Sequence, residues 1–182
     1  MIRGRLVACA ALIAAASCST PPADGRYVQQ SLPDRTTFQP VAQLLVVRCG
    51  SLDCHGTTAR NLRLYGSGGL RFASGDRPLV PLCDTQAEVD QDYQSVVGLE
   101  PELLSAVVAS GGANPERLTI VRKARGAEAH KGGQIWMQGD DSDRCLTSWL
   151  AGAVNANACA QGMASVLPGG AGNPLLQCPA SP

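Results

Sequence analysis

Cysteine is the residue type that most limits how this chain of 182 residues can fold. Aromatic side chains make up only 4% of the sequence, so a core built mainly from Leu, Val and Ala is thin and needs further support. Six of the eight cysteines follow residue 18: Cys49, Cys54, Cys83, Cys145, Cys159 and Cys178. In an oxidising compartment they can form three disulfides, or two of them can hold a cofactor while four form two disulfides.

The N-terminus predicts that the chain enters such a compartment. Arg3 and Arg5 are followed by an uncharged apolar run, Leu6 to Ala16, and by small residues directly before Cys18. This order is typical of a secretory signal, and the run is too short to span a bilayer. The stretch AASC resembles the lipoprotein box of bacterial exported proteins. The resemblance implies a signal peptide over residues 1–17, lipidation of Cys18 and a location in the bacterial cell envelope, facing the periplasm or the cell surface. Ordinary cleavage near Ala16, giving a soluble periplasmic protein, is the alternative.

The segment from the lipidated Cys18 to Gln39 is rich in Pro, Gln, Asp and Thr, and we expect a tether that holds the domain to the membrane through its lipid anchor. Beyond residue 17 the chain carries 13 basic and 15 acidic residues, because Arg3 and Arg5 precede that point. This balance offers no electrostatic footprint for nucleic acid.

Start and stop signals predict a mostly α domain over residues 40–152, with small helices and long loops. The expected helices run from Pro40 to Cys49, from the Thr85–Glu88 capping box to Gly98, from Pro101 to Gly111, from Asn114-Pro115 through Val121, and from Asp141 or Ser142 to Gly152. The alternating segment 60–66 predicts a short strand. Residues 153–182 are rich in Gly and Pro and predict a loose tail, with a possible disulfide between Cys159 and Cys178.

The string CGSLDCHG, residues 49–56, is the most specific motif. A c-type haem is held by two cysteine thioethers, and the histidine after the second cysteine is the proximal ligand of the iron. The usual string has two residues between the cysteines, whereas four intervene here, and Gly50 eases the bulge that they require. The motif therefore predicts covalent haem at Cys49 and Cys54, with His55 below the iron.

The order of further motifs resembles divergent cytochrome c-like domains of planctomycete and myxobacterial exported proteins. The matching segments are His55-Gly56, Leu62-Arg63-Leu64, Pro115-Glu116-Arg117-Leu118, His130-Lys131-Gly132-Gly133 and Trp149-Leu150-Ala151-Gly152. The resemblance spans residues 49–152. It implies a small helical, disulfide-stapled cytochrome c-like domain carrying one haem c.

A distal ligand to the iron is expected from the second half of this domain. His130 is the only other histidine of the chain, and it lies in a Gly-rich stretch. Met137 lies in the kind of irregular segment that supplies a distal methionine, and this choice would raise the reduction potential. The sequence leaves His130 and Met137 open as alternatives.

From these motifs we expect a lipoprotein that transfers electrons between redox partner proteins in the envelope. We do not expect it to be an enzyme. Hydrolase motifs are absent from the sequence. The alternative is a haem-free lipoprotein with a structural or binding role, in which Cys49 and Cys54 form disulfides. A zinc site from Cys49, Cys54, His55 and His130 has suitable ligand types, but adjacent residues at 54 and 55 are awkward for one tetrahedral ion.

Overall fold

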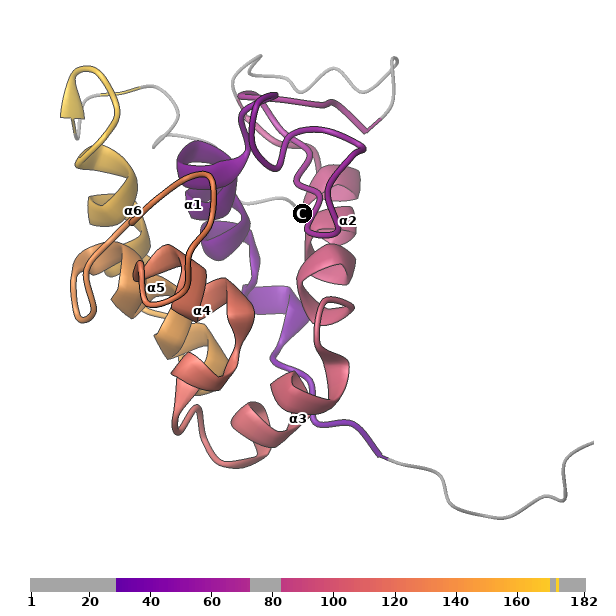
Figure 1. The fold of residues 1–182 in the computed structure, drawn as a ribbon. Coiled ribbons are helices and arrows are strands. Elements are labelled where there is room, and N and C mark those ends of the chain that lie inside the picture. Colours follow the sequence, from indigo (N-terminus) through magenta and orange to yellow (C-terminus); the bar gives the residue numbers. More distant parts are fainter. Residues whose placement is uncertain (1–28, 73–82, 171–172, 174–182) are drawn as a thin grey trace, which may run out of the picture.

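A computed structural model describes residues 29–72, 83–170 and 173 of the chain, and this part is mostly helical (Figure 1). It contains the helices α1 (Gln39–Cys49), α2 (Gln86–Val97), α3 (Pro101–Ala109), α4 (Thr119–Ala124), α5 (Asp141–Leu150) and α6 (Ala156–Ala164). Two 3-10 turns, Arg35–Thr37 and Pro115–Arg117, precede α1 and α4. No β-strand occurs within the described ranges, so the predicted mostly α class is confirmed.

Local signals place most helix starts. The capping box of α2 forms as predicted, since the Thr85 hydroxyl accepts from the Glu88 N–H and the Glu88 carboxylate accepts from the Thr85 N–H. Pro101 occupies the first turn of α3, where its missing N–H costs no hydrogen bond. The cap of α5 is Asp140 rather than the predicted Asp141 or Ser142, and its side chain accepts from the Asp143 N–H.

The strand predicted over residues 60–66 does not form; only an isolated bridge joins Tyr65 and Leu70. Side chains of α2 accept hydrogen bonds from two backbone N–H groups of this segment, which in a β-sheet would pair with a neighbouring strand. The Arg63 N–H donates to the Ser95 hydroxyl at 2.7 Å, and the Tyr65 N–H donates to Asp92 at 2.7 Å. The alternation of polar and apolar residues in this segment places Leu62 and Leu64 in the hydrophobic core between the helices.

The segment after residue 152 is not simply a loose tail, because it contains α6, which is capped by the Asn155 side chain. Helix α6 packs against α1 and α5 (Figure 1). Cys159 faces α5 and is bonded to Cys145 rather than to Cys178, which lies outside the described residues. Packing of α6 on α5 places the Cα atoms of Cys145 and Cys159 4.6 Å apart, with both residues fully buried.

The domain begins before residue 40, so part of the expected tether belongs to it. Phe38 is fully buried, with its ring 4.7 Å from that of Trp149 and 5.5 Å from that of Tyr93. The Tyr93 hydroxyl donates to the Pro33 carbonyl, and the Trp149 indole donates to the Asp34 carbonyl. These contacts hold the chain from residue 33 onward against the core.

Helix α1 positions the candidate site. Its buried face, which includes Val41, Leu44 and Leu45, contacts α2, α5 and α6. The last residue of α1 is Cys49, so this helix delivers the Cys-His string from a fixed point in the core. None of the helices within the described residues is both long and apolar enough to cross a bilayer.

Candidate functional site

The Cys-His string folds into a compact loop at the end of α1. The Cys54 and Gly56 N–H groups both donate to the Ser51 carbonyl, and the His55 N–H donates to the Cys49 carbonyl at 3.0 Å. Residues 50–53, which separate the two cysteines, therefore form a turn that brings His55 back beside the Cys49 backbone. Gly56 is required here, because a Cβ atom at this position would lie 2.0 Å from the Gly50 carbonyl oxygen.

The ring of His55 is held in one orientation. Its Nδ1 atom lies 2.9 Å from the Leu62 carbonyl oxygen, which can only accept a hydrogen bond. Nδ1 therefore carries the proton, and Nε2 keeps the free lone pair that a metal ligand needs. The His55 carbonyl in turn accepts from the Leu64 N–H at 2.9 Å, so both the ring and the backbone of His55 are fixed by the segment 62–64.

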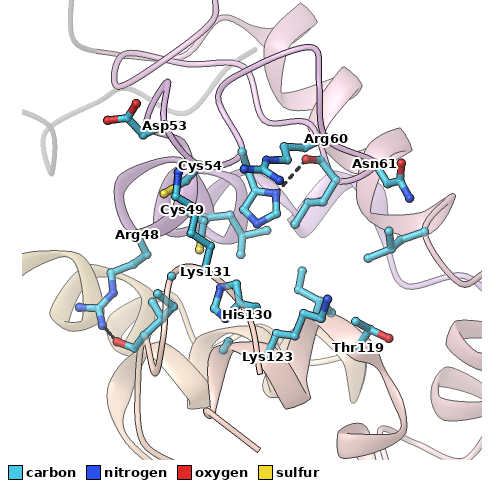
Figure 2. A pocket seen from close by; sticks show the side chains of 18 of the residues that line it. Arg48, Cys49, Asp53, Cys54, Arg60, Asn61, Thr119, Lys123, His130 and Lys131 are labelled. Carbon is cyan, nitrogen blue, oxygen red and sulfur yellow. Dashed lines mark hydrogen bonds between the residues drawn. The ribbon is translucent and has the colours of Figure 1, made fainter. Parts of the chain in front are cut away.

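His55 lines a cavity of about 640 Å³ between two walls. Figure 2 shows Cys49 and Cys54 on one side of it and Thr119, Lys123 and His130 on the opposite side. Apolar side chains cover both walls: Leu45, Leu62, Leu99, Ile120, Ile135 and Trp136. A volume of this size lies in the range of small-molecule and cofactor sites.

Cys49 and Cys54 line this cavity as free thiols. The other three described cysteines, Cys83, Cys145 and Cys159, are disulfide-bonded. Burial raises the pKa of the Cys49 thiol to about 12, against the opposing effect of Arg48. Cys49 is therefore a protonated thiol at neutral pH, which disfavours a role as a thiolate nucleophile. Among the described residues, the cysteines divide into a free pair at the cavity and disulfide-bonded cysteines elsewhere.

His130 approaches the cavity from the segment between α4 and α5. Burial lowers the pKa of His130, and the nearby His55 and Lys123 lower it further, so the neutral imidazole is favoured. The neutral ring is the form that binds metal ions. Its buried Nδ1 atom has no hydrogen-bond partner in the part of the chain that the structure describes.

The second distal candidate, Met137, does not line the cavity. Its side chain is 68% exposed, while its backbone N–H donates to Asp140 in the turn before α5. Met163 lies on α6 and packs into the hydrophobic core. Of the histidine and methionine alternatives, the fold therefore brings only His130 to the wall opposite the Cys-His string.

The ligand types considered for zinc do not converge. Within residues 29–72, 83–170 and 173, no three His, Cys, Asp or Glu side chains are arranged to hold a metal ion. Cys49, Cys54, His55 and His130 instead line two walls of a wide cavity. This arrangement suits a bulky cofactor between the walls better than one tetrahedral ion.

Sequence reasoning missed the basic residues around the cavity. Arg48, Arg60, Lys123 and Lys131 line it, together with Asp53 and Glu100. Glu100 accepts from the N–H and the hydroxyl of Thr119. Arg48 joins the two walls, because its guanidinium donates to the Ile135 carbonyl. The positions of Arg48 beside Cys49 and of Lys131 beside His130 could have drawn attention to these two residues, whereas Arg60 and Lys123 lie outside the motifs.

Comparison of the chain with protein-family models, curated proteins and solved structures finds no match. The candidate site therefore depends on its own geometry. The expected lipidation site, Cys18, lies outside the described residues.

Proposed function

We propose that this protein is a mono-haem c-type cytochrome that transfers single electrons. The observation that carries the proposal is the fixed ring of His55, with Nδ1 bound to the Leu62 carbonyl at 2.9 Å and Nε2 left free in a cofactor-sized cavity. Metal-bound histidines almost always donate their second ring N–H to a carbonyl or carboxylate, which fixes the tautomer and raises the basicity of the ligand. His55 fits the role of proximal ligand.

The two free thiols fit covalent attachment. Cys49 ends α1 and Cys54 precedes His55, so both thiols lie at the wall that carries the proximal ligand. Each S–H would add across one vinyl group, with sulfur bonding one carbon and the proton reaching the other. The haem would supply a one-electron couple between ferrous and ferric iron.

His130 is the proposed distal ligand, because it lies on the wall opposite the Cys-His string whereas Met137 is exposed. The basic residues Arg48, Arg60, Lys123 and Lys131 give this cavity the charge that suits the carboxylates of a haem. A pair of histidines predicts a lower reduction potential than a histidine and a methionine would give.

We place this activity in the bacterial cell envelope. The basic start, apolar run and Cys18 of the N-terminus support export and lipid anchoring, with redox proteins of the envelope as electron partners. Neither catalysis nor nucleic-acid binding is part of the proposal.

The test is a pyridine haemochrome spectrum of protein expressed with its signal in a host that matures c-type cytochromes. We expect an α-band and haem that survives acid–acetone extraction. Cys49→Ser and Cys54→Ser should each leave one thioether and shift the α-band, and the double variant should lose the haem on extraction. Met137→Leu is the matched control and should leave the spectrum unchanged. A colourless protein with a Cys49–Cys54 disulfide would instead support the haem-free lipoprotein.

A further inference from the structure

The two histidines of the cavity differ in how they are held. His55 is bound through its backbone N–H, its carbonyl and its ring Nδ1. Among the described residues, His130 has a buried Nδ1 atom without a partner, so none of them fixes its tautomer or supports its basicity as a ligand. Loss of such a supporting hydrogen bond typically weakens metal binding by about 10- to 100-fold.

The segment that carries His130 is anchored at its ends. The Ile135 and Trp136 N–H groups both donate to the Ala124 carbonyl at the end of α4. Between these anchors, residues 131–134 are exposed, and Gly126 and Gly133 have positive φ angles of 73° and 66°. The residue therefore lies on a short exposed loop rather than on a helix, and movement of this loop requires little loss of buried surface.

The imidazole of His130 lies over the turn that residues 130–133 form. The Gly133 N–H donates to the His130 carbonyl at 3.0 Å, and Nε2 lies where Gly132 has no side chain. A Cβ atom at Gly132 would be 2.7 Å from Nε2 and 3.1 Å from Cε1. Gly132 thus leaves space in which the ring can rest against the turn, with Nε2 beside the backbone.

From these three observations we infer that His130 is a displaceable ligand, so that the position opposite His55 binds a small diatomic molecule. This inference rests on the proposed haem. His55 would keep its fixed ring as the retained ligand, while His130 would have the space beside Gly132 in which to rest away from a bound haem. The protein would then combine electron transfer with reversible binding of a diatomic ligand of ferrous iron.

The experiment uses the purified haem protein, reduced with dithionite and titrated with carbon monoxide while its Soret and α-bands are recorded. We expect the wild type to form the carbon monoxide adduct. His130→Ala should bind carbon monoxide about tenfold more tightly or more, because the competing ligand is removed. Gly132→Ala fills the space beside Nε2 and should slow adduct formation.

Two results would overturn the inference. One is a wild-type ferrous spectrum unchanged under saturating carbon monoxide, while His130→Ala forms the adduct, since His130 would then be a permanent ligand. The other is carbon monoxide binding with the same affinity and rate in the wild type and His130→Ala, because His130 would not be a ligand. A protein that carries no haem at all would instead refute the proposed function, and its colourless preparation distinguishes the two failures.

Discussion

The Nδ1 atom of His55 lies 2.9 Å from the carbonyl oxygen of Leu62. The two positions are seven apart in the sequence, and the loop between them folds back because the Leu64 N–H also donates to the His55 carbonyl. A substitution at Leu62 changes the side chain and keeps the backbone carbonyl. Most variants of Leu62 therefore retain this hydrogen bond to the His55 ring. The relationship explains how His55 presents Nε2 to the cavity in a fixed orientation.

Replacing His55 should remove the proximal ligand without removing the thiols. We expect His55→Ala to lose the low-spin spectrum of a six-coordinate haem while the haem stays covalently attached. Added imidazole should restore the spectrum in part, because the cavity then accommodates the missing ring. Absorption spectra with and without imidazole measure this, and His55→Ala with an unaltered spectrum would contradict the assignment.

The thiol of Cys49 should be slow to react in haem-free protein. Its pKa of about 12 leaves little thiolate, and thiolate is the reactive form. In Cys54→Ser we expect alkylation of Cys49 at pH 8 to be roughly tenfold slower, or more, than in the urea-unfolded chain. Mass spectrometry after timed quenching follows the reaction. Equal rates in the folded and unfolded chains would show that the Cys49 thiol is not protected.

Asp92 should make the folded state less stable as the pH rises. It is fully buried on α2 and interacts with the carboxylates of Asp84 and Glu88. Its Oδ1 accepts from the Tyr65 N–H, and its Oδ2 has no partner among the residues that the structure describes. Burial, with smaller contributions from the neighbouring carboxylates and against the hydrogen bond from Tyr65, raises its pKa from 3.8 to about 8. The folded chain therefore holds a proton that the unfolded chain releases near pH 4.

The sign follows from proton linkage. Asp92 disfavours folding progressively as the pH rises from about 4 to about 8, and the loss is complete above the folded pKa. We expect the free energy of unfolding to fall between pH 5 and pH 8.5 by on the order of 4 kcal/mol more in the wild type than in Asp92→Asn. Urea unfolding at the two pH values measures the difference. Parallel losses in the two proteins would exclude Asp92 as the cause.

The Cys145–Cys159 disulfide should hold α6 against α5. It closes a loop with a sequence separation of 14, and both cysteines are fully buried. A crosslink of this loop length stabilises a fold by about 3 kcal/mol, chiefly by restricting the unfolded chain. The double variant Cys145→Ala/Cys159→Ala should have a correspondingly lower unfolding midpoint in urea. Reducing agent should then cause no further loss of stability through this disulfide. An unchanged midpoint would show that packing alone holds α6.

Much of the helical structure follows from local chemistry. Thr85 and Glu88 satisfy each other's backbone donors, Pro40 and Pro101 favour first turns, and glycines follow α1 and α2. These interactions join residues a few positions apart, so they are visible in the sequence. The failed strand over residues 60–66 had an equally clear pattern. Its partners, Ser95 and Asp92, lie on a helix about 30 residues away, and no local signal indicates them.

The residue types of the candidate site can be read from the sequence: two cysteines, a histidine after the second, and one further histidine. How they are used follows from the packing of the helices. It paired Cys159 with Cys145, left Cys49 and Cys54 free, and placed His130 rather than Met137 at the cavity. A disulfide, a cavity wall and a hydrogen bond to a carbonyl all depend on distances between elements. Those distances arise from the packing of α1, α5 and α6, which no short stretch of sequence encodes.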